Sequence, residues 1–249
     1  MIVLSAPVIG GRFRFTLWPT LFTIPAVLLM LGLGTWQVQR LAWKTGLINA
    51  REAAIHADPT PLPHSLAEAR PLDFHRVSTG GTFLNDKEFY VGALSPRGNE
   101  GFQIVTPLRL ADGSLLLVNR GWVPDKQKDP ATRAVGQLTG PVEIDGVLRV
   151  PVTPTGFIVP TNRPAENFWF WVDPAAMAGA GYLDKVLPFF IEAGAAANPG
   201  GYPMGGQTRI SLPNDHLQYA ITWYMLAVAL VVVYFVYHYR KPGSEADKD

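Results

Sequence analysis

Two long apolar stretches without a charged residue lie near the two ends of the chain. The first covers Phe15–Gln39 and the second covers His216–Tyr239. At a rise of about 1.5 Å per residue, a helix of either length can cross a hydrocarbon core of roughly 30 Å. A half-exposed helix of a water-soluble domain would instead carry charged residues on one face. The pattern therefore predicts two transmembrane helices with one large domain between them.

The two stretches divide the chain into predicted segments. These are a tail at residues 1–16, a transmembrane helix at 17–38, a domain at 39–215, a second transmembrane helix at 216–238 and a tail at 239–249. We prefer an uncleaved first helix to a secretory signal peptide. Its apolar part exceeds the roughly 7–15 residues of a signal core, and no A-x-A-like cleavage site follows it.

Basic residues at the ends of the apolar stretches favour one orientation in a membrane. On the side of the two termini lie Arg12, Arg14, Arg240 and Lys241. Arg40 and Lys44 lie just beyond the other end of the first helix and oppose this orientation. The central segment is longer than the loops over which the positive-inside rule counts, so the terminal residues receive more weight. We predict both termini in the cytoplasm and the central domain outside it.

Short runs rich in β-branched and aromatic residues follow a proline-rich stretch in the central segment. They lie at residues 74–83, 88–94, 102–110, 114–119, 141–150 and 186–192. Asp112-Gly113 is typical of a hairpin turn, and turn residues recur at spacings typical of a small antiparallel barrel or sandwich. We therefore predict a membrane α+β fold, in which a transmembrane two-helix hairpin carries an inserted, β-rich, barrel-like extracytoplasmic domain.

Four further local features are expected in the central segment. Lys44–Ala57 is predicted to continue the first helix as a short helical piece. Phe168–Trp171 is a dense aromatic run, predicted to be a buried strand or a membrane-facing edge. Asp173–Ala180 is predicted to form a short helix, because its first residue can cap it and a proline suits the next position. Gly200–Gly206 is expected to be a flexible connector.

Composition and motifs exclude several classes of function. The net charge of +1 gives no electrostatic reason to expect a nucleic acid partner, and the absence of cysteine excludes disulfides, thiolate metal sites and thiol catalysis. The nucleophile elbow, the phosphate-binding glycine loop, the H-E-x-x-H helix and the dinucleotide-binding glycine pattern are all missing, so we predict that the protein is not an enzyme. His56, His64 and His75 have no metal-binding spacing and are interpreted as surface or turn residues.

One motif of the central segment, Asn119–Pro124, follows a strongly apolar strand. Gly121 allows a positive φ. Arg120 and Trp122 could present a cation and an aromatic face to a partner. They could equally lock a corner of the domain through a cation–π or carboxylate contact, which is the interpretation we favour.

Small and aromatic residues share one face of each predicted transmembrane helix. On the first helix these are Gly32, Trp36, Arg40 and Trp43, with Gly34 nearby. On the second helix they are His216, Tyr219, Ala220, Trp223 and Ala227. Glycine lets another helix or a flat ligand approach closely, and the spacing of one turn predicts that Arg40 stacks on Trp36. From the residues alone, His216 is either an interfacial anchor or a ligand of haem iron through a neutral ring nitrogen.

Several segments resemble, in the same order along the chain, the surfeit-locus cytochrome c oxidase assembly factors. They are Gly32–Arg40 with Trp43-Lys44, Val118–Pro124, Gly146–Arg149, Gly205–Arg209 and His216–Tyr224. The resemblance covers the chain from the first predicted span to the second. It gives the motif residues Gly34, Trp36, Arg40, Arg120, Gly121, Trp122 and Trp223 structural roles.

The resemblance implies a non-catalytic chaperone that helps to mature the catalytic subunit of a haem–copper oxidase. It implies haem a as the bound group, His216 as the iron ligand, and oxidase subunit I, haem a synthase and membrane lipid as partners. The short leader before the first span favours a bacterial chain, and hence the bacterial cytoplasmic membrane. The alternative is a structural scaffold that stabilises an early oxidase assembly intermediate without binding haem.

Overall fold

The chain divides into two compact units. The computed structural model describes residues 12–13, 16–95, 97–157, 159–210 and 212–240. One unit comprises residues 1–48 and 211–249 and is helical, whereas the other comprises residues 49–210 and contains the β-sheet.

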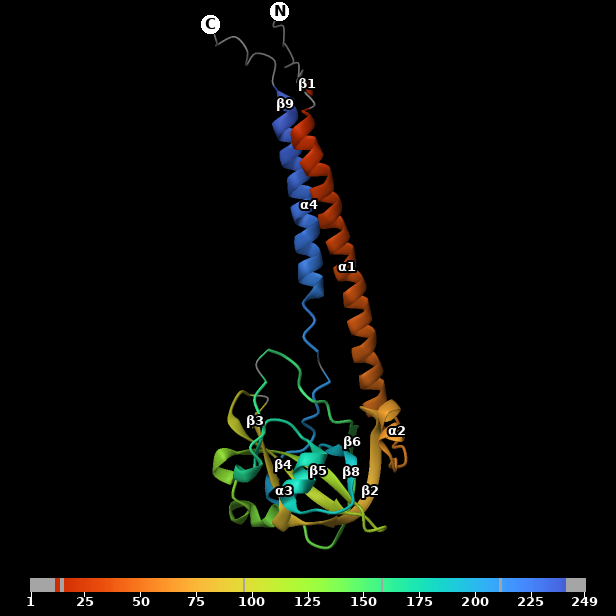
Figure 1. The fold of residues 1–249 in the computed structure, drawn as a ribbon, viewed down its shortest axis with the longest axis vertical. Coiled ribbons are helices and arrows are strands. Elements are labelled where there is room, and N and C mark those ends of the chain that lie inside the picture. Colours follow the sequence, from red (N-terminus) through yellow and green to blue (C-terminus); the bar gives the residue numbers. More distant parts are fainter. Residues whose placement is uncertain (1–11, 14–15, 96, 158, 211, 241–249) are drawn as a thin grey trace, which may run out of the picture. The chain divides into compact units, whose positions relative to one another are not determined.

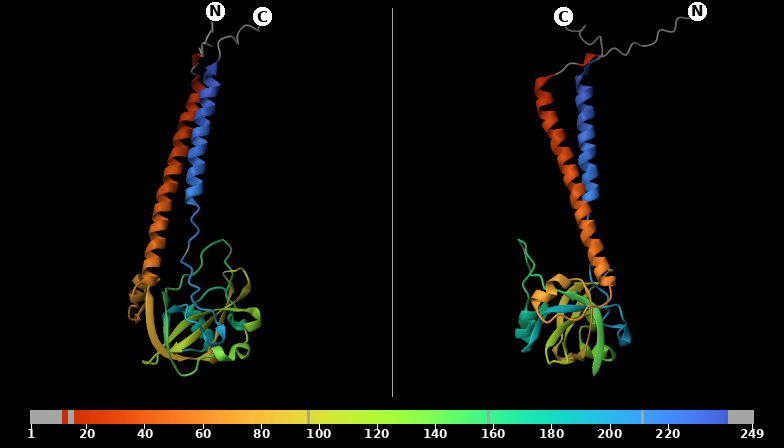
Figure 2. Two further views of the ribbon diagram at one scale, coloured as in Figure 1. Left: turned by 180° about the vertical axis from the view of Figure 1, so that it is seen from behind. Right: turned by 90° about the vertical axis from the view of Figure 1, so that its right-hand side faces the viewer.

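The helical unit consists of two long helices that run side by side (Figures 1 and 2). Helix α1 spans Leu17–His56 and helix α4 spans His216–His238. A two-residue strand β1 (Arg12–Phe13) pairs antiparallel with β9 (Tyr239–Arg240) beyond the helices. Both helices are long and apolar enough to cross a membrane. The predicted helical continuation is part of α1, and from Asn49 onward this helix belongs to the sheet-containing unit.

The other unit is built on one mixed sheet with the strand order β2-β6-β8-β5-β4-β3-β7. The strands are β2 (Arg76–Phe83), β3 (Phe89–Leu94), β4 (Glu100–Arg109), β5 (Leu115–Pro124), β6 (Pro141–Arg149), β7 (Phe168–Trp169) and β8 (Val186–Ala193). Strand β2 also pairs with β4, so strand pairing runs from β2 through β6, β8, β5 and β4 back to β2. The prediction of a β-rich domain is confirmed, and its barrel-like form stays a prediction.

The expectation of purely antiparallel pairing is wrong. Strand β8 pairs parallel with β5, and β7 pairs parallel with β3. Parallel neighbours need long crossover connections, and the chain supplies them between β5 and β8 and between β3 and β7. Hydrophobic alternation marks where strands lie but does not specify their partners.

Short helices connect the strands. The α-helices are α2 (Leu66–Ala69) and α3 (Pro174–Gly181), and the 3-10 helices are η1 (Arg70–Leu72), η2 (Asn85–Lys87), η3 (Asp125–Gln127), η4 (Pro130–Gly136), η5 (Pro164–Glu166) and η6 (Pro199–Gly201). The predicted helix after Asp173 is confirmed. The Asp173 carboxylate accepts a hydrogen bond of 3.1 Å from the Ala176 amide, which satisfies one free donor of the first turn.

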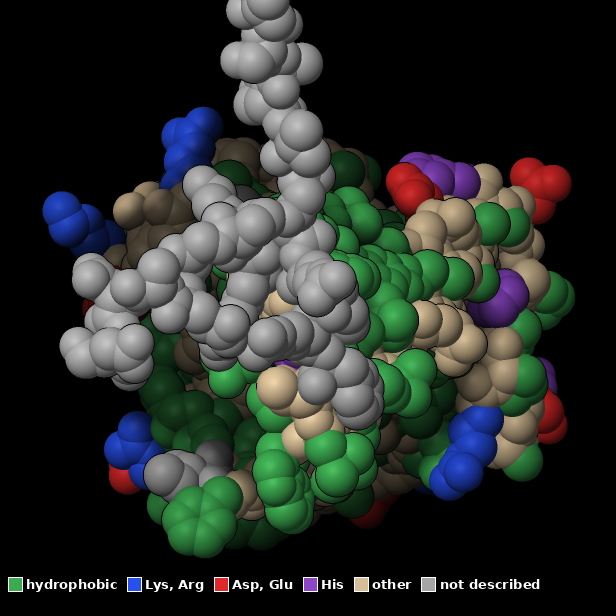
Figure 3. Space-filling model, turned by 90° about the horizontal axis from the view of Figure 1, so that it is seen from above, with side chains coloured by type: hydrophobic (Ala, Val, Ile, Leu, Met, Phe, Trp, Pro, Cys, Tyr) green, Lys and Arg blue, Asp and Glu red, His purple; other side chains and the backbone are tan. Residues whose placement is uncertain are grey.

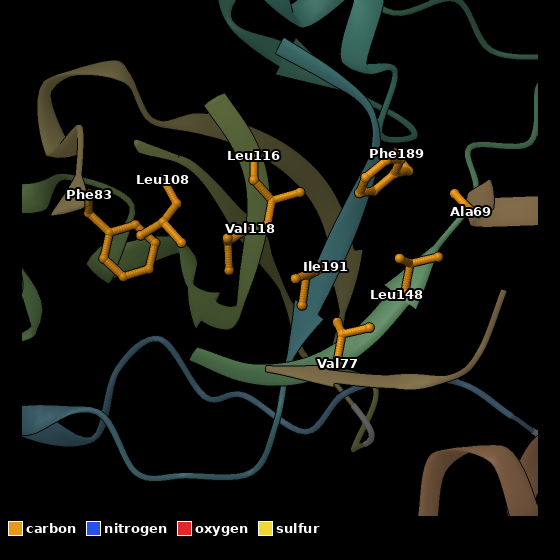
Figure 4. Close-up of a cluster of buried hydrophobic side chains, with 9 residues drawn as sticks. All are labelled: Ala69, Val77, Phe83, Leu108, Leu116, Val118, Leu148, Phe189 and Ile191. Atoms are coloured by element: carbon orange, nitrogen blue, oxygen red, sulfur yellow. The ribbon is translucent and has the colours of Figure 1, made fainter. Parts of the chain in front are cut away.

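The hydrophobic core lies on both faces of β5. One cluster gathers nine buried side chains, drawn in Figure 4: Ala69, Val77, Phe83, Leu108, Leu116, Val118, Leu148, Phe189 and Ile191. The second cluster includes Leu117 of β5 and packs beneath α3. Successive side chains of a strand point to opposite faces, so Leu116 and Leu117 enter different clusters. Burial on both faces explains the continuous apolar run at the start of this strand.

Candidate functional site

A polar pair joins the two long helices at the start of α4. The Nδ1 atom of His216 lies 2.6 Å from the Oε1 atom of Gln37 on α1. Gln37 is one of the few buried polar residues of the helical unit, with 9% of its surface exposed, whereas His216 is half-buried. The ring of Trp36 meets the imidazole edge-on, with centroids 6.5 Å apart and planes at 81°.

This contact assigns a role to each imidazole nitrogen. An amide oxygen only accepts hydrogen bonds, so Nδ1 of His216 donates its proton to Gln37. In the neutral ring, Nε2 then keeps its lone pair. Among the residues that the structure describes, Nε2 has no hydrogen-bond partner. The site thus offers one oriented nitrogen that can bind a metal or accept a proton.

Small residues bring the helices close enough for this contact. Gly34 is buried, and a Cβ atom built on it would lie 2.7 Å from Cε1 of Tyr224. The Tyr224 hydroxyl also lies 3.2 Å from Oγ1 of Thr35. Ala220 and Ala227 of α4 are almost fully buried. The absence of large side chains at these positions permits the tight approach of the helices.

Replacing Gly34 with valine is expected to separate the helices, because the new side chain would overlap the Tyr224 ring. Gly32 provides a matched control on the same helix, since a Cβ atom there would meet nothing within 4 Å. We expect Gly34→Val to lower the melting temperature of the detergent-solubilised protein by several degrees and Gly32→Val to lower it less. Equal melting temperatures for the two variants would contradict this packing.

The other predicted residues of the helical unit take different positions. The Arg40 guanidinium lies 4.0 Å from the centroid of the Trp43 ring, so the predicted stacking on Trp36 is wrong. Trp36 instead faces His216. Trp223 is half-buried, two turns into α4.

The motif on β5 builds a second polar cluster, inside the sheet-containing unit. Only 2% of the Arg120 surface is exposed. Its Nη1 atom lies 3.8 Å from Oε1 of Glu88, and its Nη2 atom donates to the carbonyl of Gly136. The Phe83 ring lies below the guanidinium, 4.6 Å from Cζ. Burial lowers the pKa of Arg120 to about 10, against the opposing attraction of Glu88.

A second arginine shares the same carboxylate. Nη1 of Arg133 lies 3.0 Å from Oε1 of Glu88, and its Nη2 atom donates to Oε2. The side chain of Gln137 adds a hydrogen bond of 3.2 Å to Oε1. One buried carboxylate therefore holds two buried guanidiniums and ties β5 and η4 to the residue that precedes β3. Sequence reasoning missed Glu88 and Arg133, although a buried arginine requires a carboxylate partner.

Gly121 and Trp122 fix the C-terminal segment of this unit to β5. Gly121 has φ 118°, and a Cβ atom there would lie 1.9 Å from the carbonyl oxygen of Met204. Trp122 and Met204 exchange two backbone hydrogen bonds of 2.9 Å. Glycine is required here because any side chain would push this segment away. The expected flexible connector at 200–206 is therefore partly tied to the sheet.

The sheet-containing unit holds three histidines, His56, His64 and His75, but its described residues form no multi-residue metal site. A cavity of about 420 Å³ lies beside Asn119. Two arginines line it, Arg149 and Arg209, and Arg149 is already paired with Asp73 at 3.4 Å and Glu192 at 3.1 Å. Within the described residues, no group of three or more histidine, aspartate or glutamate side chains could hold a metal ion. A haem iron needs only one protein nitrogen, which His216 can supply.

Comparison with known proteins places these residues in a family. The model of the SURF1 family matches residues 24–228, which include both Gln37 and His216. The chain belongs to the SURF1 family. A SURF1-like protein of Monosiga brevicollis is 39% identical over 92% of this chain and 90% of the relative. Surfeit locus protein 1 of Homo sapiens is 40% identical over 82% of this chain and 72% of the relative. Surfeit locus protein 1 of Takifugu rubripes is 38% identical over 89% of this chain and 96% of the relative.

The family match extends across both units. It begins within α1 and ends within α4, so it includes most of both helices and all seven strands of the sheet. The resemblance inferred from the sequence motifs is confirmed at the level of the family.

Proposed function

We propose that this protein is an assembly factor for a haem–copper oxidase that holds haem a through Nε2 of His216. Membership of the SURF1 family implies a role in cytochrome c oxidase assembly. The observation that supports a haem-binding role is the Gln37 contact, which leaves Nε2 free to bind iron. Haem a is here the cargo, and a histidine nitrogen would hold its iron.

The residues around His216 fit a flat apolar group. Gln37 holds the proton on Nδ1, which fixes the tautomer and the ring orientation, as the outer partner of a metal-binding histidine usually does. Trp36 is half exposed beside the imidazole and offers an aromatic surface. Binding through a single histidine also suits a carrier, because a haem held by one protein ligand can be released to the next protein.

The proposed partners follow from this role. Haem a synthase would deliver the cargo, and oxidase subunit I would receive it. The function requires no catalytic step, so we propose a chaperone and not an enzyme.

A scaffold without haem is the second candidate. The hydrogen bond between Gln37 and His216 also links α1 to α4, and such polar contacts stabilise helix pairs in membranes. His216 would then serve only to position the helices while another part of the chain stabilises an oxidase intermediate.

Haem content distinguishes the two candidates. We expect the full chain, purified from cells that make haem a, to carry haem in about a one-to-one ratio, with the visible absorption of a histidine-bound haem. Gln37→Leu removes the acceptor for Nδ1 and is expected to weaken haem binding about 10–100-fold. Gln37→Glu keeps an acceptor and should bind more tightly than Gln37→Leu. Wild-type protein without haem would favour the scaffold.

We further propose that both helices cross a bacterial cytoplasmic membrane and that residues 49–210 lie outside the cytoplasm. Large apolar side chains on both helices are more than half exposed, including Phe22, Leu28, Val232 and Val236. Exposing so many apolar side chains to water would be unfavourable, whereas lipid acyl chains would cover them. Hydrophobic side chains make up much of the face shown in Figure 3, with charged groups mainly toward its edge.

The orientation can be read from reporter fusions. Alkaline phosphatase fused within residues 60–200 is expected to be active, because it folds only outside the cytoplasm. Green fluorescent protein fused at the same positions should not fluoresce, because it does not become fluorescent when the general secretory route exports it. The reverse pattern would place the sheet-containing unit in the cytoplasm.

A further inference from the structure

The connection between β6 and η5 is a long loop without a charged residue. It runs from Val150 to Asn162, between Arg149 and Arg163. The described part of this loop contains neither helix nor strand. Ile158 lies outside the described residues. Such a composition is unusual for a surface loop, because loops facing water usually carry polar and charged side chains.

Two apolar side chains of this loop face solvent. Phe157 is fully exposed, and 71% of Val152 is exposed. Covering an exposed phenylalanine with apolar surroundings is favourable, because it removes apolar surface from water. Pro151, Pro154 and Pro160 restrict the backbone of the loop, so docking would cost less conformational entropy than in a flexible loop. The loop is therefore suited to bury its apolar side chains against a partner.

The loop rises from the side of the sheet-containing unit at which the chain enters and leaves. In Figures 1 and 2 the last turns of α1, the loop and the segment leading to residue 210 lie on this same side. Only residues 211–215 separate this unit from α4. A segment of this length spans at most ~20 Å, so a membrane that holds α4 lies close to the exit of the chain.

We propose that the loop is a membrane-interface anchor, in which Phe157 and Val152 enter the boundary between lipid headgroups and acyl chains. The inference rests on the membrane insertion contained in the proposed function. Lipid fits this loop because no carboxylate in it would repel an anionic surface. The attachment through both helices keeps the bilayer at a high effective concentration, so a small apolar anchor is sufficient. The anchor would limit how the sheet-containing unit can turn relative to the bilayer.

Single cysteine probes can test this anchor directly, because the chain has no cysteine of its own. Val152→Cys leaves Phe157 in place and reports from the loop. Val232→Cys on α4 is the control for insertion of the helices, with 54% of its surface exposed. Tyr182→Cys is the control for a water-facing position, because 93% of Tyr182 is exposed and two charged residues follow it closely.

Each full-length variant is labelled with a polarity-sensitive fluorophore and placed in nanodiscs of phosphatidylcholine and phosphatidylglycerol. Lipids with brominated acyl chains quench fluorophores that enter the bilayer to a depth of about 5–10 Å or more. We expect quenching and a blue shift at positions 152 and 232 but not at 182. Phe157→Asp is then added to each of the Val152→Cys and Val232→Cys variants. It should abolish quenching at position 152 and leave quenching at position 232 unchanged.

Each other outcome overturns the proposal in a distinguishable way. Quenching at 232 without quenching at 152 would leave membrane insertion intact and refute the loop anchor. If neither position is quenched, insertion of the helices is refuted, and the anchor with it. If 152 is unquenched by lipid but becomes shielded when purified oxidase subunit I is added, the loop binds protein and the lipid assignment is wrong.

Discussion

Replacing Glu88 with alanine is expected to lower the free energy of unfolding of the sheet-containing unit by about 3–5 kcal/mol. Within the described residues, Glu88 is the only carboxylate that forms an ion pair with Arg120 or with Arg133, and the change removes it. Both arginines are almost fully buried, so water cannot replace the lost carboxylate without opening the structure. The remaining positive charges would also repel each other.

An exposed ion pair provides the control for this prediction. Glu166 lies 2.9 Å from Arg163, but both side chains are at least half exposed. We expect Glu166→Ala to cost less than about 1 kcal/mol, because water already screens this pair. Denaturant titration of the full chain in detergent, followed by tryptophan fluorescence, measures both effects. Similar midpoints for the two variants would mean that the buried cluster is not a major source of stability.

The long helices and most strands were predictable from the sequence because their signals are local. The length of a charge-free stretch decides whether a helix can span a bilayer, whatever it packs against. The cap of α3 likewise depends on neighbouring residues only, and Asp173 caps the helix as expected. The parallel pairing of β8 with β5 was not predictable, because alternation is the same for either direction.

The partners within each site could not be predicted in the same way. Glu88 and Arg133 are 45 residues apart, and Gln37 and His216 are 179 residues apart. One signal was nevertheless available. Gln37 is an amide inside an apolar stretch, and a buried amide must find a hydrogen-bond partner. When two apolar stretches pack as antiparallel helices, the end of the first stretch lies beside the start of the second. Gln37 lies near the end of the first stretch, and His216 begins the second. The contact between Gln37 and His216 could thus have been predicted from the sequence, but Gln37 was overlooked.

Replacing His216 with glycine is expected to abolish stable haem binding, because it removes the imidazole nitrogen that the Gln37 contact orients. The effect on the helix should be small, since His216 is the first residue of α4. His238→Gln is the matched control on the same helix. Its imidazole contacts Thr16 and Tyr234 at the other end of α4, and its loss should leave haem binding unchanged.

The most direct test is chemical rescue of the purified His216→Gly variant with free imidazole. The truncated side chain leaves room for an imidazole molecule, whose nitrogen can replace the missing ligand. We expect the variant to bind little haem alone, and we expect added imidazole to restore haem binding and the absorption spectrum of the wild type. Wild-type haem binding and an unchanged spectrum in His216→Gly without imidazole would contradict ligation by His216.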